Sequence, residues 1–126
     1  MICLDTNYLI RMLISETLES KRVKKWLKKG EQLTTSSIAW YEFLCGPVGE
    51  AEIQTVRACL QGGIVAFEEA QINEAARLFN VTGRARHLRI DAMIAACAVT
   101  ANIPLATDNN EDFCAFVKHG LILMAE

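Results

Sequence analysis

The sequence predicts an α/β fold, a three-layer α/β/α sandwich around a mostly parallel, five-stranded sheet. Short apolar runs of strand length alternate along the chain with longer amphipathic segments, which is the pattern of βαβ units. With 126 residues the chain has the length of one ordinary domain, which we expect to span residues 1–126. No linker, repeat or low-complexity segment interrupts this pattern.

The first half of the chain supplies three of the five predicted strands. Apolar runs predict strands at residues 2–4, 32–37 and 62–67. Helices are predicted from Thr6 to near Ser15 and at residues 16–30, 38–46 and 49–61. The helix at 16–30 has acidic residues first, basic residues last and Gly30 at its end, which matches the helix macrodipole and a glycine C-cap.

The second half contains the most hydrophobic helix. Residues 90–101, IDAMIAACAVTA, are apolar almost all round, which is typical of a buried helix. Further helices are predicted at residues 70–82 and 110–120, and further strands at 103–107 and 121–124. Pro104 stands at the entrance of its strand, where proline is tolerated.

Composition excludes several classes of protein. Hydrophobic residues make up 52% of the chain, too many for a disordered protein. The net charge of −2 and the isoelectric point of about 5.7 give no general nucleic-acid signature, so contacts with RNA or DNA must come from local basic patches. The five cysteines stand singly, which argues against a zinc site and favours a reducing compartment. Without a signal peptide or a membrane-length apolar run, the chain is expected in the cytoplasm.

Carboxylates follow two of the predicted strands, at the edge of the sheet where parallel α/β proteins bind their ligands. Asp5 follows the first strand, and Asp108 follows the strand at 103–107, so both should face the same edge. Asp112 comes a few residues later. Glu42 stands among aromatic and aliphatic neighbours, and Asp91 opens the most hydrophobic helix. Since a carboxylate in such surroundings is seldom buried without a partner, we expect these acids to converge.

Several acids at one edge repel one another unless a cation neutralises them. Two unit charges about 4 Å apart repel by roughly 1 kcal/mol in water and by several times that when partly buried. Hard oxygen ligands with open water positions suit Mg²⁺ or Mn²⁺, which activate water and stabilise phosphoryl displacement. The residue types therefore favour metal-assisted phosphodiester hydrolysis. Each acid also has a plainer interpretation, as a helix cap or, for Glu42, as an outward surface residue.

Two basic clusters bear on the substrate. Arg84, Arg86 and Arg89 immediately precede Asp91, and we expect them to bind a phosphate backbone close to the acids. His87 lies among them and by itself does not indicate a general base. The lysines of the helix at 16–30 are interpreted first as an ordinary solvated face that keeps the protein soluble.

Four segments carry a family pattern: LDTNYLI at the N-terminus, SSIAWYEFLCG with Glu42, RIDAMIAACAV with Asp91, and IPLATDNNEDF. In this order they resemble a PIN domain, and more closely the VapC-type toxin ribonucleases of bacterial toxin–antitoxin pairs. The resemblance spans nearly the whole chain. It implies an endoribonuclease dependent on Mg²⁺ or Mn²⁺, a homodimer, and a small antitoxin protein as partner.

The resemblance also assigns roles. It makes Asp5, Glu42 and Asp91 metal-binding catalytic acids. In the mechanism that we expect, Asp5 and Asp91 ligate the metal directly, and Glu42 positions or deprotonates the attacking water. The residues that support these acids are Thr6, Asn7 and Thr107.

The fourth catalytic acid stays open between Asp108 and Asp112. Asp112 is also a candidate metal ligand, and Asn109 a neutral ligand or water anchor.

Other functions fit parts of the pattern. A receiver-like domain needs a lysine after a late strand, and none follows LAT. A haloacid-dehalogenase-like phosphatase needs Asp-x-Asp after the first strand, where this chain has Asp5-Thr6-Asn7. A non-catalytic RNA-binding or scaffolding PIN domain remains the alternative, although such a module tends to lose acids that this chain retains. The RNA that is cleaved and the use of DNA as a substrate stay open.

Overall fold

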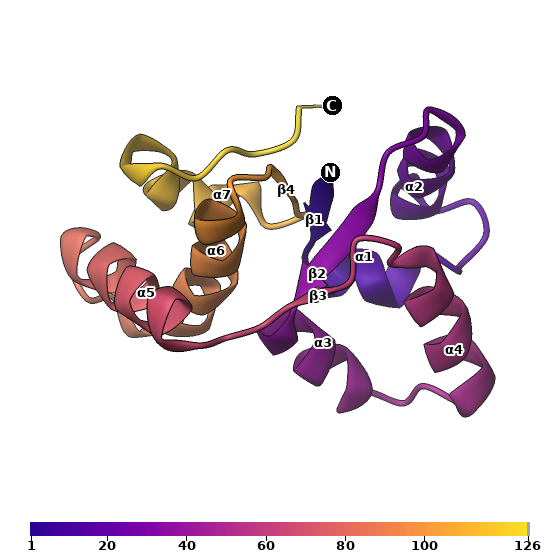
Figure 1. Cartoon of the computed structure of the whole chain (residues 1–126), viewed down its shortest axis with the longest axis horizontal. Coiled ribbons are helices and arrows are strands. Elements are labelled where there is room, and N and C mark those ends of the chain that lie inside the picture. Colours follow the sequence, from indigo (N-terminus) through magenta and orange to yellow (C-terminus); the bar gives the residue numbers. More distant parts are fainter. Residues whose placement is uncertain (126) are drawn as a thin grey trace.

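The protein contains a four-stranded parallel sheet with helices on both faces, as seen in a computed structural model that describes residues 1–125 (Figure 1). The strands are β1 (Ile2–Leu4), β2 (Leu33–Ser36), β3 (Ile64–Val65) and β4 (Leu105–Ala106). Their order is β3-β2-β1-β4, and every neighbouring pair is parallel. The predicted α/β class and parallel sheet are confirmed.

The fifth predicted strand, at residues 121–124, is reduced to a single parallel bridge between Leu105 and Leu123. The amide of Leu105 donates to the carbonyl of Ile122 at 2.8 Å, and the amide of Met124 donates to the carbonyl of Leu105 at 2.9 Å. The segment therefore lies beside β4, as a fifth strand would. Because β4 is itself only two residues long, the ladder does not extend further.

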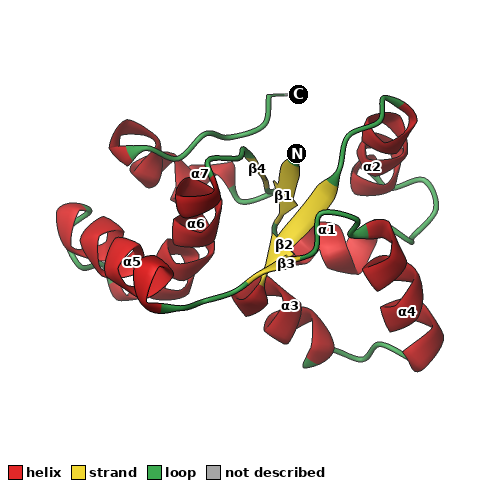
Figure 2. Cartoon of the chain, viewed as in Figure 1, coloured by secondary structure: helices red, strands yellow, loops and turns green. Residues whose placement is uncertain are grey.

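Seven α-helices and two 3₁₀ turns connect the strands within residues 1–125 (Figure 2). The α-helices are α1 (Thr6–Arg11), α2 (Leu18–Lys28), α3 (Ser37–Leu44), α4 (Glu50–Cys59), α5 (Glu69–Val81), α6 (Arg89–Ala101) and α7 (Asn110–Phe113). The 3₁₀ turns are η1 (Arg86–Leu88) and η2 (Cys114–His119). No helix among these residues has both the length and the apolar character of a membrane span.

Two predicted helices differ in extent from the observed ones. The first was expected to reach Ser15 but ends at Arg11. There the chain turns through Glu16, whose φ is 69°, and Thr17 caps α2 by accepting a hydrogen bond from the amide of Ser20. The helix expected at 110–120 is divided into α7 and the tighter turn η2.

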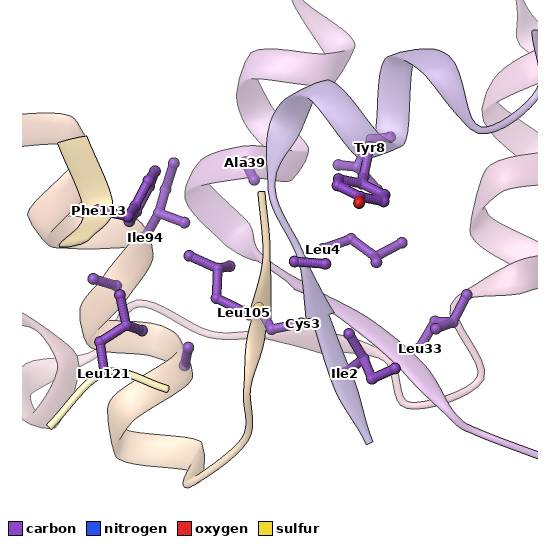
Figure 3. Close-up of a cluster of buried hydrophobic side chains, with 14 of the residues drawn as sticks. Ile2, Cys3, Leu4, Tyr8, Leu33, Ala39, Ile94, Leu105, Phe113 and Leu121 are labelled. Carbon is purple, nitrogen blue, oxygen red and sulfur yellow. The ribbon is translucent and has the colours of Figure 1, made fainter. Parts of the chain in front are cut away.

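The core fills both faces of the sheet. Figure 1 shows α5, α6 and α7 on one side of the sheet and α1, α2 and α4 on the other. Every residue of β1 is buried, as expected for a central strand covered twice. In Figure 3, Ile94 and Phe113 lie on one side of β1, and Tyr8 and Leu33 lie on the other. The packed layers hold the carboxyl ends of the strands in fixed positions.

Candidate active site

The carboxyl ends of β1 and β4 meet where the sheet reverses its strand order. From β1 the chain builds outward through β2 and β3, and later returns to add β4 on the other side of β1. Such a switch point opens a crevice beyond the ends of the two strands. Asp5 directly follows β1 and Thr107 directly follows β4, so both residues stand at this crevice.

Asp5 is a helix cap and a member of the site at the same time. Its side chain is only 6% exposed, at the N-cap of α1. Oδ1 accepts a hydrogen bond from the amide of Thr6 at 2.8 Å, and Oδ2 accepts one from the hydroxyl of Thr107 at 2.7 Å. Burial raises the pKa of Asp5, both hydrogen bonds oppose this rise, and the charge of Glu42 adds to it. The plainer interpretation as a cap is thus correct without excluding the other one.

Glu42 joins the same network through Thr6. The carboxyl end of β2 leads directly into α3, because Ser36 ends the strand and caps the helix by accepting a hydrogen bond from the amide of Ala39 at 2.9 Å. The hydroxyl of Thr6 donates to Oε1 of Glu42 at 2.7 Å. Thr6 therefore connects the exposed carboxylate of Glu42 with the buried carboxylate of Asp5.

Asp91 is the point at which the charges of the other acids converge. It lies half-buried in the first turn of α6. Burial raises the pKa of Asp91 to about 6, and the charges of Asp5, Asp112 and Glu42 raise it as well, while His87 opposes them. The charges of Asp5, Asp112 and Glu42 therefore reach Asp91. That these acids form one catalytic group stays a prediction.

Hydrogen bonds of Asn109 connect Asp112 to the network around Asp5. The amide of Asn109 donates to the hydroxyl oxygen of Thr107 at 2.9 Å, and its side-chain Nδ2 donates to Oδ2 of Asp112 at 3.1 Å. Nε2 of His87 lies 3.8 Å from Oδ1 of Asp112. Thr107 consequently links the Asp5 carboxylate to the loop that carries Asp112.

Asp108 belongs to a different cluster. When Asp108 is protonated it donates a hydrogen bond to Glu19, and the charges that act on it are those of Glu19, Arg11 and Arg22. Burial and the contact with Glu19 raise the pKa of Asp108 to about 6, and the two arginines oppose this rise. Asp108 is therefore not brought into the group around Asp91, although it stands only one residue after Thr107.

The sequence analysis missed the partners of Asp108. Glu19 is 4% exposed, and its Oε2 lies 3.9 Å from Nη1 of Arg11. The guanidinium of Arg22 donates to the hydroxyl of the buried Tyr8 at 2.8 Å. A helical wheel gives the missing signal, because Glu19 shares the buried stripe of α2 with Val23 and Trp26.

The three arginines expected to bind RNA differ in their contacts. Arg84 donates from Nε to Oδ1 of Asn80 at 3.1 Å, and the guanidinium of Arg89 lies 5.4 Å from the ring centroid of Phe79. Within residues 1–125, Arg86 has no side-chain hydrogen bond or ion pair. Asn7, the remaining expected support residue, is exposed in the first turn of α1.

The donor chemistry of the group suits a hard divalent cation. All four acids present oxygen ligands, and their mutual repulsion is the kind that bound Mg²⁺ or Mn²⁺ relieves. Among the described residues, no three His, Cys, Asp or Glu side chains are yet arranged around one point to hold a metal.

Comparison with known proteins agrees with this fold. The PIN domain family matches residues 2–118. A toxin–antitoxin complex from Klebsiella pneumoniae contains a chain that is 24% identical, with a TM-score of 0.66 and 90% of both chains covered. VapBC2 from Rickettsia felis, bound to a DNA fragment from its promoter, gives 21% identity, a TM-score of 0.72 and 98% coverage of both chains.

VapBC-1 from nontypeable Haemophilus influenzae is similar at 20% identity, with a TM-score of 0.71 and coverage of 98% of this chain and 97% of that chain. No curated protein sequence matches the chain. At these identities the structural likeness establishes the fold.

Proposed function

Because the chain belongs to the PIN domain family, we propose that it is a metal-dependent endoribonuclease and the toxin of a toxin–antitoxin pair. The single observation that supports the activity most is a hydrogen-bond network at the switch point of a parallel sheet, which links the carboxylates of Glu42, Asp5 and Asp112 through Thr6, Thr107 and Asn109. The structural neighbours support a family of toxin nucleases. The RNA substrate and the metal are parts of the proposal.

In this proposal Asp5, Asp91 and Asp112 hold the cation, which supplies charge stabilisation at the phosphoryl oxygens and lowers the pKa of water. Glu42 orients the attacking water and accepts its proton, since its carboxylate is exposed and fixed on one side by Thr6. Thr107 orients Asp5, and Asn109 orients Asp112. Asp108 stays outside the reaction, as a structural partner of Glu19.

The substrate side of the proposal rests on charge. Arg86 is exposed in η1, between the acids and α5, and is free to bind a phosphate of the RNA. Arg84 and Arg89 are also exposed and remain candidates for the same role, although each has a partner on α5. Asn7 is exposed beside Asp5 and Thr6, where it would contact substrate or water.

A non-catalytic RNA-binding PIN domain is the second function considered. Such a domain has no need of a costly group of repelling carboxylates, because a binding surface for RNA favours positive charge. Burial raises the pKa of Asp91 most, and the charges of Asp5, Asp112 and Glu42 add to this rise, so repulsion is part of its cause. Retention of all four acids therefore favours catalysis.

We propose that the antitoxin binds in the apolar groove between α1, α3 and α4. This groove has a volume of about 330 Å³. Its rim includes Ile10, Leu13 and Ile14, which are 43%, 41% and 51% exposed. Exposed apolar side chains in a contiguous groove are typical of a protein-binding surface.

We also propose that the protein is a homodimer, in line with the family resemblance. We propose that it acts in the cytoplasm, since its five free cysteines fit a reducing compartment.

The proposed activity is tested by incubating total cellular RNA with the purified protein in Mn²⁺ or Mg²⁺ and in chelator. Asp91→Asn serves as the inactive control and Lys118→Gln, on the exposed surface of η2, as the matched surface control. Discrete products that require both the metal and Asp91 are expected. Intact RNA in all reactions of a folded protein would favour the non-catalytic domain.

A further inference from the structure

The lysines of this chain are concentrated on one face of α2. Five of the six lysines in the sequence fall between residues 21 and 29. All five are exposed, and together they line a shallow hollow of about 480 Å³: Lys21, Lys24, Lys25, Lys28 and Lys29. The opposite face of α2 packs into the core through Val23 and Trp26, so this lysine face points to solvent.

Little in the chain neutralises the lysine face. Nζ of Lys21 lies 3.7 Å from Oε2 of the exposed Glu16. The other four lysines have no ion pair or side-chain hydrogen bond within the part of the chain that the structure describes. Lysines three and four positions apart repel one another along a helix, so this arrangement works against the stability of α2. In a chain of net charge −2, five of the 13 lysines and arginines are thus gathered on one surface.

The lysine face begins beside the candidate active site. Glu19, in the first turn of α2, is hydrogen-bonded to Asp108, which directly follows Thr107 of the site. The positive charges of Arg11 and Arg22 partly neutralise the carboxylates of Glu19 and Asp108. From there the lysines extend along α2 for roughly 12 Å at 1.5 Å per residue, which is room for several phosphates about 3.4 Å apart along a helical strand.

This surface is separate from the arginines near Asp91. Figure 1 shows α2 at the outer edge of the molecule, across the sheet from α5 and α6. Arg84, Arg86 and Arg89 lie at the ends of those two helices. An RNA strand that passes the acids can therefore meet positive charge on both sides of the site.

We propose that the lysine face of α2 binds the phosphate backbone of the RNA outside the point of cleavage. This inference rests on the proposed ribonuclease function and adds a second, sequence-independent contact to it. Lysine is depleted at the centres of protein–protein interfaces, and membrane-binding helices place large apolar side chains below their lysines. The hollow is lined by lysines alone, which fits a polyanion held by charge.

The test measures the affinity of the protein for a labelled RNA that is long enough to reach α2, in chelator and over a series of salt concentrations. The variant Lys24→Gln/Lys25→Gln/Lys28→Gln removes three charges with little change in helix propensity. We expect at least tenfold weaker binding at low salt. The slope of log K against log salt should be shallower by about 2, since each lost phosphate contact on a single strand removes roughly 0.7.

Two controls separate charge from structure. The matched variant Lys24→Arg/Lys25→Arg/Lys28→Arg keeps the charges and should bind as the parent does. Lys118→Gln, on η2, removes one lysine elsewhere and should also bind as the parent does. Circular dichroism of each variant checks that α2 is intact. Equal affinity and slope in the parent and the triple glutamine variant would overturn the inference.

A cleavage assay in Mn²⁺ shows whether a negative result concerns only the lysine face or the proposed ribonuclease function as well. The triple glutamine variant should lose more activity on long RNA than on an RNA too short to leave the acidic site. If the parent cleaves RNA but the variant binds and cleaves long RNA equally well, the lysine face has no such role and the ribonuclease function stands. If the parent neither binds nor cleaves RNA, both proposals are wrong.

Discussion

The hydroxyl of Thr107 lies 2.7 Å from Oδ2 of Asp5, a contact between residues 102 positions apart in the sequence. The two residues directly follow neighbouring parallel strands, so the contact joins the carboxyl ends of β1 and β4 at the crevice. It also holds one oxygen of a buried carboxylate in a fixed direction. The other oxygen accepts from the amide of Thr6, and the orientation of Asp5 is therefore determined from both sides.

Loss of the Thr107 hydroxyl should weaken both stability and activity. Thr107→Val keeps the shape of the side chain but leaves the buried Asp5 carboxylate without one donor. We expect the free energy of unfolding to fall by about 1–3 kcal/mol, and activity to fall by about tenfold to a hundredfold. Urea denaturation and initial cleavage rates measure the two effects. Thr107→Ser keeps the donor and should restore most of both, and a Ser variant as impaired as the Val variant would contradict this role.

Asp91 should make the stability of the metal-free protein depend on pH. Its pKa is raised from an ordinary 3.8 to about 6, so the folded protein holds the proton more tightly than the unfolded chain does. The resulting stabilisation is fully present below about pH 4 and is lost as the pH rises through about 6. Because Asp91 is half-exposed and therefore screened, we expect about 1 kcal/mol rather than the full effect of the shift.

Asp91→Asn removes that dependence and should be more stable than the parent at pH 7 by a similar amount. Urea denaturation in chelator between pH 4 and 7 measures the difference between the two proteins. Asp108, whose pKa is also raised to about 6, is present in both and cancels in the comparison. Parallel stability curves for the parent and Asp91→Asn would show that neither burial nor the other acids raise the pKa of Asp91 in the folded protein.

Asp112 and Asp108 should differ in their effect on catalysis. The charge of Asp112 raises the pKa of Asp91, whereas the carboxyl group of Asp108 is paired with that of Glu19. Asp112→Asn is therefore expected to reduce the cleavage rate by about a hundredfold or more, in the range of other lost transition-state contacts. Asp108→Asn should stay within about threefold, or roughly 0.7 kcal/mol, of the parent. The reverse ranking in a single-turnover assay would assign the fourth acid to Asp108.

Partner binding should depend on the apolar groove between α1, α3 and α4. Ile14 is 51% exposed at its rim, and full burial of such a side chain stabilises a complex by about 1.5–3 kcal/mol. We expect Ile14→Lys to weaken binding of the proposed antitoxin by at least about tenfold. Ile122→Lys, which alters a residue 53% exposed outside the groove, is the matched control in calorimetric titration. Equal affinities would place the partner elsewhere.

Much of the fold was predictable because its signals are local. The run before Asp5 is apolar and short, and residues 90–101 are apolar on every side, so both elements follow from the sequence alone. The strand at 121–124 and the helix at 110–120 were less well predicted. Their form depends on the two-residue length of β4 and on the turn after it, which are tertiary features.

The acids of the candidate site could be named from the sequence, and their catalytic role stays a prediction. Asp5 follows a strand and Asp91 lies in the first turn of a helix, whereas Glu42 was singled out as an acid among apolar neighbours within α3. The choice between Asp108 and Asp112 could not be made, since one residue past a strand end decides whether a side chain faces the crevice or α2. Glu19 was passed over because an acid in the first turn of a helix already satisfies the macrodipole.

The measurement that tests the central claim most directly is calorimetric titration of Mn²⁺ into the parent, Asp5→Asn, Asp91→Asn and Asp108→Asn at neutral pH. If the converging acids form one cation site, the parent and Asp108→Asn bind Mn²⁺ with similar affinity. The Asp5 and Asp91 variants should then bind at least about tenfold more weakly. Unchanged binding in Asp5→Asn and Asp91→Asn, or no binding by the folded parent, would contradict the claim that these carboxylates are a metal site.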